Sequence, residues 1–158
     1  MSLQQWLEYG WLRPHKSSNR EISDLLRIID RDLQDAAGNI SSDWRFGIAY
    51  NAALKLCTIL LCAEGYRPEK TLQHYRAIQA LPLILGSHRE TDTKYLDTCR
   101  NKRNVAEYDY VGGVTKNDVD ELIAFVKGLR ARRSHSMAGK TTSGFATWRW
   151  VKLIQLFY

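Results

Sequence analysis

The sequence of 158 residues has few of the residues that mark turn-rich or covalently cross-linked proteins. It has only 10 Gly and 3 Pro, which excludes a collagen-like or low-complexity chain and disfavours an all-β fold with many turns. The three cysteines, Cys57, Cys62 and Cys99, include no Cys-x-x-Cys motif and have no pair of histidines nearby. We therefore expect neither a disulfide framework nor a zinc site. P-loop, His-Glu-x-x-His and calcium-loop patterns are also missing, and we predict no bound cofactor or metal.

Long apolar segments are missing as well. No uninterrupted apolar run approaches the length of about 18 residues that a membrane-spanning helix needs. The N-terminal segment carries Trp6 and Trp11 but also Glu8 and Arg13, which does not fit the apolar core of a signal peptide. We therefore expect no integral membrane segment and a cytoplasmic location.

Acidic residues are absent from one end of the chain. Residues 122–158 contain seven Lys or Arg and no Asp or Glu, whereas residues 1–121 contain 16 basic and 17 acidic residues. The formal net charge of +6 therefore belongs to a basic C-terminal segment, and the body is nearly neutral. Residues 134–158 begin as a small polar linker and end in a basic and aromatic tail. Such a tail is typical of nucleic-acid or anionic-membrane contact, or of a terminus foreign to the domain. It is also typical of packing on its own domain or on a partner subunit, which we favour.

Apolar residues recur at three- and four-residue spacing over most of the chain, which is typical of amphipathic helices. We predict helices over about 18–38, 43–64, 68–81 and 92–108, and a last helix that begins at Thr115. Capping boxes are expected at Ser18 with Glu21 and at Thr115 with Asp118. Pro82 should end or kink the third helix, because its ring clashes with the preceding turn.

The helix over 43–64 has little polar face, so it should lie at the centre of the fold. No strand pattern emerges from the sequence. We therefore predict an all-α, up-and-down bundle of about five helices over residues 18–133. Residues 1–17 then form an N-terminal extension, and residues 134–158 form the linker and tail.

A polar stripe on the helix over 92–108 carries the most informative residues. Arg100, Arg103, Asn104 and Glu107 share this stripe, because positions three and four apart lie on one helix face. Arginine presents fixed donors that suit a phosphate, and asparagine can orient a neighbouring group. The same residues are also typical of a solvated face with ordinary ion pairs such as Arg103–Glu107. Both interpretations fit the sequence.

Five short segments of the chain share a further likeness. They are Ser42-x-Trp44, Tyr50-Asn51-Ala52-Ala53-Leu54, Gly65-Tyr66-Arg67-Pro68, Ala80-Leu81-Pro82-Leu83 and Arg103-Asn104-x-Ala106-Glu107-Tyr108-Asp109. Together they resemble the HEPN superfamily over roughly residues 20–132. The resemblance implies a helical bundle that is commonly a homodimer. It also implies a metal-independent ribonuclease, or a toxin paired with a nucleotidyltransferase.

The family motif is an Arg, often followed by Asn, and then a His after a short spacer. Arg103 and Asn104 match its start, Tyr108 occupies the His position, and Tyr110 matches a trailing tyrosine of one toxin branch. The resemblance thus implies Arg103, Asn104 and Tyr108 as catalytic residues, and Arg100, Arg103 and Tyr110 as ligand-binding residues.

Tyr108 departs from the motif in a way that matters for catalysis. The reference pKa of tyrosine is about 10, against about 6.5 for histidine, so Tyr108 is a poor base near neutral pH. His74 is expected at the edge of the core or in an interface. Two functions therefore stay open: a toxin-type ribonuclease or RNA and nucleotide binder, and a catalytically silent module that partners a nucleotidyltransferase or another protein.

Overall fold

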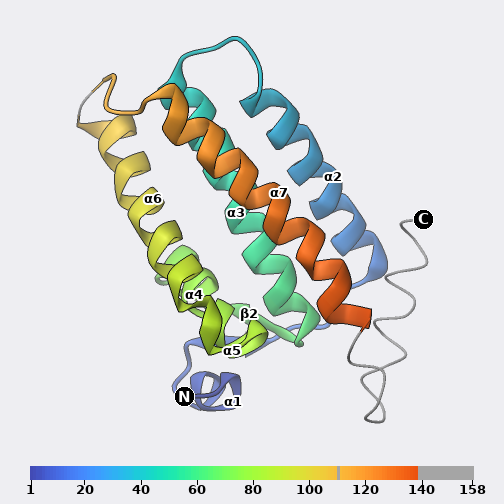
Figure 1. The fold of residues 1–158 in the computed structure, drawn as a ribbon. Helices are drawn as coiled ribbons and strands as arrows, with labels where there is room; N and C mark the ends of the chain where they lie inside the picture. The colour runs from blue at the N-terminus through green and yellow to red at the C-terminus, as the bar shows by residue number, and fades with distance from the viewer. Residues whose placement is uncertain (110, 139–158) are drawn as a thin grey trace.

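The structure is a computed structural model that describes residues 1–109 and 111–138, with side chains up to residue 131. The long helices of this part of the chain are α2 (Asn19–Ala36), α3 (Ser42–Ala63), α6 (Glu90–Tyr108) and α7 (Lys116–Ala138). They run alternately in opposite directions, and α3 contacts each of the others (Figure 1). The prediction of a helical bundle with the 43–64 helix at its centre is confirmed, whereas the all-α part of the prediction is wrong, because the described residues also form a small two-stranded sheet.

The C-terminal boundary differs from the prediction. α7 continues to Ala138, so residues 134–138 are helical instead of the start of a linker. The basic and aromatic tail at 139–158 lies outside the described residues.

Shorter elements gather at one end of the bundle (Figure 1). They are α1 (Leu3–Glu8), β1 (Leu12–Pro14), β2 (Tyr66–Pro68), α4 (Gln73–Gln79), α5 (Leu81–Leu85) and the 3-10 turn η1 (Ser87–Arg89). β1 and β2 pair in an antiparallel ribbon with Leu12 opposite Pro68. The expectations of no strand and of a helix from Pro68 are therefore wrong. Proline is tolerated at the end of an edge strand, because no backbone hydrogen bond has to be donated from that position. The break between α4 and α5 at Ala80 agrees with the expected effect of Pro82.

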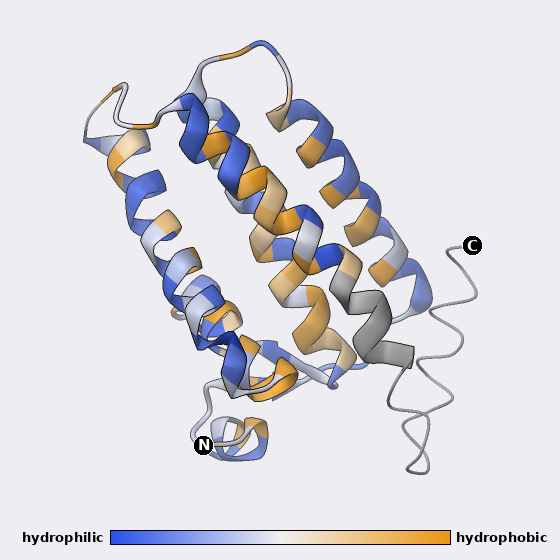
Figure 2. Cartoon of the chain, in the orientation of Figure 1, coloured by the Kyte–Doolittle hydropathy of each residue, from blue (hydrophilic) through white to orange (hydrophobic). Residues whose placement is uncertain are grey.

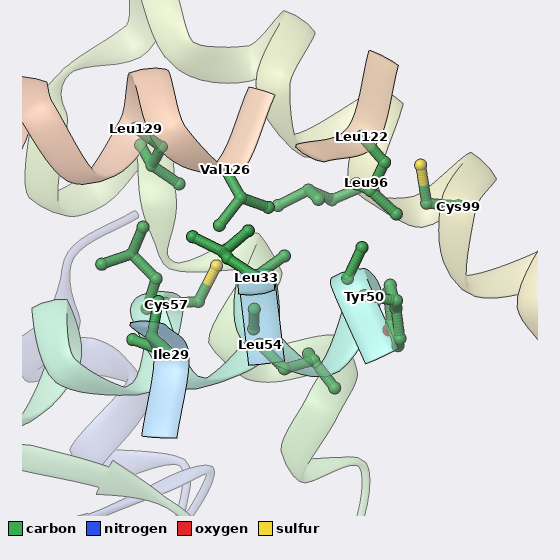
Figure 3. Packing of buried hydrophobic residues seen from close by; sticks show 14 of the residues in the cluster. Ile29, Leu33, Tyr50, Leu54, Cys57, Leu96, Cys99, Leu122, Val126 and Leu129 are labelled. Atoms are coloured by element: carbon green, nitrogen blue, oxygen red, sulfur yellow. The ribbon is translucent and has the colours of Figure 1, made fainter. Parts of the chain in front are cut away.

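α3 is buried on nearly every side. Figure 3 shows how its Tyr50, Leu54 and Cys57 lie among apolar side chains of α2, α6 and α7. Ala49, Ala52 and Ala53 are fully or almost fully buried as well, and their small side chains let the neighbouring helices approach closely. By length and composition α3 could cross a membrane, and 72% of its most apolar window is buried inside the fold. That burial is what the central helix of a bundle requires.

The outer helices are amphipathic. Hydrophilic residues follow the outward side of α2 and much of α6 (Figure 2). Asp32 is the exception on α2, since it is only 5% exposed. Its carboxylate accepts hydrogen bonds from Lys55 Nζ at 2.7 Å and from Arg31 at 2.8 Å. A buried carboxylate needs a charged partner, and the Asp32–Lys55 pair therefore links α2 to α3.

The helix starts follow the predicted chemistry in part. Asp118 and Thr115 form the reciprocal capping bonds expected at the start of α7. At α2, Ser18 accepts a hydrogen bond from the Glu21 amide, but the Glu21 side chain turns to His15 and Arg67 instead. Half of that capping box is therefore replaced by contacts to the segments around β1 and β2.

The N-terminal residues pack on the bundle. Trp6 and Leu12 form a small apolar cluster with Leu61 and Ala80. The guanidinium of Arg76 lies 3.6 Å from the ring centroid of Trp11, close enough for a cation–π contact. Residues 1–14 thus cover the end of the bundle where α3 gives way to β2 and α4.

Candidate functional site

A hollow of about 250 Å³ lies where α6 passes the start of α4. On the α6 side it is lined by Arg100, Arg103 and Asn104, which share one face of that helix. On the other side it is lined by residues 70 and 72–75 at the start of α4. The structure therefore brings the predicted Arg100, Arg103 and Asn104 together around one concave surface, which we call the first hollow.

Both arginines of the first hollow are held in place by carboxylates of α6 itself. Arg103 Nε lies 2.9 Å from Glu107 Oε1, and Arg100 Nε donates to Asp97 at 3.0 Å. The Arg103 side chain is 23% exposed, so its guanidinium is partly removed from water. Arg103 also donates to the Asn104 side chain at 3.4 Å. A partly desolvated and positioned guanidinium suits bidentate recognition of a phosphate or carboxylate.

Tyr50 from α3 also lines the first hollow, although it is only 1% exposed. Its hydroxyl has no hydrogen-bond partner in the described part of the chain. Burial raises the pKa of Tyr50, and the nearby charges of Arg100 and Arg103 oppose that rise only in part. The phenol therefore stays protonated at neutral pH, and its hydroxyl is a buried donor without a partner among the described residues.

His74 is exposed at the rim of the first hollow, so it is not at the edge of the core, and of the two expected places the interface stays a prediction. Partial burial of its ring lowers the pKa of His74, and the positive charge of Arg103 lowers it further. The imidazole is therefore neutral at pH 7, where it can accept a proton. This side of the hollow is also lined by Lys70, Leu72, Gln73 and Tyr75.

The two predicted tyrosines do not join this group. Tyr108 is 76% exposed and is not among the residues that line the first hollow. The reason is geometric: α6 ends at Tyr108, one helical turn past Asn104, where its side chain lies in solvent. Tyr110 lies outside the described residues. The sequence instead missed Tyr50, Lys70, Gln73 and His74, which come from other elements.

A separate cluster contains metal-ligand types. The ligand atoms of His15, Glu21 and Cys62 lie within 4.8 Å of one another at the base of α2. His15 Nε2 is 3.0 Å from the Glu21 carboxylate, and Arg67 donates to the same carboxylate at 2.7 Å. Burial raises the pKa of the Cys62 thiol, while Arg67 partly opposes the rise. The Arg67 guanidinium thus already supplies the positive charge that this carboxylate needs.

No family model, curated protein or solved structure matches this chain. What the first hollow can bind therefore follows from its side chains. Arg100, Arg103 and Lys70 supply positive charge, and the Tyr50 phenol supplies a buried donor. Such a set favours an anionic ligand with several acceptor oxygens.

Proposed function

We propose that this chain is a HEPN-like helical protein that binds the phosphate groups of RNA or of a nucleotide in the first hollow. The observation that carries the proposal is the convergence of Arg100 and Arg103 with the unpartnered Tyr50 hydroxyl in one concave site. A phosphate presents several acceptor oxygens to the donors of the two guanidiniums that their carboxylate partners leave free, and the two guanidiniums can neutralise its charge. The resemblance of the Arg103-Asn104 segment to the HEPN motif supports the same ligand class.

The binding test compares Arg103→Ala with a control that removes one positive charge elsewhere on α6. Lys94→Ala is that control, because Lys94 is exposed and does not line the hollow. Arg103→Ala should cost roughly 1.5–3 kcal/mol of RNA binding, the scale of a hydrogen bond to a charged group. Titration of a labelled RNA at one fixed salt concentration measures this loss. Equal binding by the two variants would refute the assignment.

Two further variants probe the neighbours of Arg103. Glu107→Gln should strengthen binding, because the Glu107 carboxylate competes with a phosphate for the Arg103 guanidinium. Tyr108→Phe should leave binding unchanged, because the Tyr108 side chain lies in solvent outside the hollow. A strong loss in Tyr108→Phe would instead restore this tyrosine to the site.

A second candidate function is metal-independent RNA cleavage, with His74 as the base in place of the missing motif histidine. The observation that favours it is the neutral imidazole of His74 at the same hollow as Arg103. A neutral base can take the proton of the attacking 2′-hydroxyl while the guanidinium stabilises the developing charge on the phosphate. The 2′-oxygen would bond to phosphorus as the P–O5′ bond breaks, and the leaving 5′-oxygen would take a proton from water. The products would be a 2′,3′-cyclic phosphate and a free 5′-hydroxyl.

The cleavage test uses His74→Gln, which keeps polarity and size but removes the base. Cleavage should vanish in His74→Gln and persist in EDTA, while RNA binding changes little. The parent rate should rise as the pH passes the lowered pKa of His74, because only the neutral imidazole accepts a proton. Cleavage that survives in His74→Gln would exclude this role and leave the binding function.

We also propose that the chain forms a homodimer through the end of α6. Val105, Tyr108 and Val111 are 46%, 76% and 85% exposed, an apolar group on the surface near the C-terminus of α6. Val105 and Tyr108 lie three positions apart on one face of α6, and apolar side chains exposed together on a surface mark interaction sites. Val105→Glu should shift a dimer to a monomer in light scattering, and a parent that is already monomeric at tens of micromolar would refute it.

A further inference from the structure

A second hollow adjoins the first one. Its volume is about 340 Å³, and it lies between α3, the β1–β2 ribbon and the start of α4. It shares Lys70, Gln73 and His74 with the first hollow, so the two hollows adjoin along this segment, and we call them together the groove. The second hollow adds Arg13 from β1 and Arg67 from β2 to the basic lining.

The charged side chains that line this groove are all basic. Lys55 completes the cations of the second hollow, and no Asp or Glu is among the described residues that line either hollow. This positive lining is a local feature, because residues 1–121 as a whole carry 16 basic and 17 acidic residues. A stretch lined by one sign of charge attracts a polyanion more strongly than the net charge of the protein suggests.

The carboxylates that balance these cations lie outside the groove. Lys55 pairs with Asp32 at 2.7 Å, and Arg67 pairs with Glu21 at 2.7 Å. These pairs hold the two side chains in place while their remaining donors can face a ligand. Neither Arg13 nor Lys70 is in an ion pair within the described part of the chain, so both side chains can turn toward a ligand.

An aromatic side chain stands beside the basic lining. Tyr75 lines the first hollow, is 38% exposed, and lies 5.8 Å from the Arg100 guanidinium across its ring. An exposed aromatic ring next to backbone-binding cations is the arrangement on which unpaired bases stack. A free phosphate or a mononucleotide would leave most of this groove uncovered.

We propose that the groove binds a single-stranded nucleic acid across both hollows, with successive phosphates on the two sides of the Lys70–His74 segment. This inference rests on the proposed phosphate-binding function of the first hollow and specifies its ligand as a strand of several nucleotides. The first hollow holds one phosphate through Arg100 and Arg103, and the second holds a neighbouring phosphate through Arg13. Stacking on Tyr75 makes the binding tolerant of base sequence.

The test titrates the full-length protein with uridine dinucleotide, which has one bridging phosphate, and with labelled hexauridylate, both at fixed salt. The variants are Arg13→Ala for the second hollow, Arg103→Ala for the first and Lys94→Ala as the charge-matched control. Arg13 is exposed, and β1 pairs through its backbone, so Arg13→Ala leaves the ribbon intact. Circular dichroism melting checks that each variant is folded.

We expect the hexamer to bind the parent at least about tenfold more tightly than the dinucleotide, because it reaches cations in both hollows. Arg13→Ala should weaken hexamer binding about three- to tenfold, lower its salt dependence, and leave dinucleotide binding at the parent value. Arg103→Ala should weaken the binding of both the hexamer and the dinucleotide. A hexamer of deoxyuridine run in parallel shows whether the groove distinguishes RNA from DNA through the 2′-hydroxyl.

Two failures are distinguishable. If the hexamer binds no more tightly than the dinucleotide, or if Arg13→Ala behaves like Lys94→Ala, the extended groove is wrong while the first hollow keeps its function. If Arg103→Ala behaves like Lys94→Ala with both ligands, the proposed phosphate-binding function itself is wrong.

Discussion

Asp118 links α6 to α7 and caps the N-terminus of α7, so its replacement is a sensitive test of the fold. At the first turn of α7 its carboxylate accepts hydrogen bonds from the Thr115 amide and from the Thr115 hydroxyl, each at 2.9 Å. It also accepts a hydrogen bond from Lys102 of α6 at 2.7 Å. These bonds lower the pKa of Asp118 from 3.8 to about 2, with the Lys102 bond as the largest cause.

The expected loss can be worked out from these contacts. Asp118→Ala removes a helix cap and a partly exposed ion pair, which together are worth about 1–2 kcal/mol of unfolding free energy at pH 7. The lowered pKa gives an upper bound of roughly 2.5 kcal/mol. Solvent screening of a side chain that is 25% exposed reduces this bound toward the first figure.

The pH dependence has a definite sign. The pKa of Asp118 is lower in the folded protein than in the unfolded chain, so its ionised form stabilises the fold above about pH 4. That contribution is lost as the pH falls from 4 toward 2, where the folded protein also takes up the proton. The difference between parent and Asp118→Ala should therefore shrink on acidification.

Urea unfolding followed by circular dichroism at pH 7 and at pH 3 measures both effects. Asp118→Asn keeps an amide oxygen for Thr115 and loses the charge, so it should fall between the parent and Asp118→Ala. Asp24→Asn is the control, because the nearest basic nitrogens are 3.7 Å and 3.9 Å from this exposed carboxylate. A loss in Asp118→Ala equal to the control, or unchanged between the two pH values, would refute the reasoning.

Three other predictions concern stability and accessibility. All three cysteines are buried, and burial raises the pKa of Cys57 to about 12, so the native protein should resist a water-soluble thiol reagent at pH 8. Three thiols should react in urea, and fast labelling without urea would contradict the packing. Arg76→Ala removes the cation over Trp11, so it should change tryptophan emission and cost roughly 0.5–2 kcal/mol in urea unfolding. An unaltered spectrum would exclude the contact. Gly86→Ala places a Cβ 2.9 Å from the His88 ring at a φ of 106°, which should cost roughly 1–3 kcal/mol in thermal melting. A Gly86→Ala variant as stable as the parent would show that the turn adjusts to the added Cβ and would contradict this prediction.

The parts of the fold that the sequence predicts are those determined by local pattern. The 43–64 segment has apolar residues on every side, and only the centre of a bundle can bury such a helix. Thr115 and Asp118 are three residues apart, so their reciprocal bonds follow from spacing alone. The β1–β2 ribbon is different. Leu12-Arg13-Pro14 and Tyr66-Arg67-Pro68 are too short to show alternation, and each needs a partner that is distant in the sequence.

The candidate site divides in the same way. Arg100, Arg103 and Asn104 share one helix face, so periodicity places them together. His74 and Lys70 reach the hollow from another element, and no periodic pattern relates them to α6. Tyr50 has the apolar neighbours of a core residue, and only the structure shows that its hydroxyl has no partner. An unmatched polar residue on a buried helix is the one sequence signal that points to it.

The ribbon also determines when the groove can form during folding. Pairing Leu12 with Pro68 closes a chain loop that contains all of α2 and α3. The entropy of closing so long a loop is recovered only after those two helices have packed, so we expect β1 to dock late. Arg13 belongs to β1, so it reaches the second hollow only when β1 docks. We therefore expect the second hollow, which needs Arg13, to form only once β1 has docked on β2.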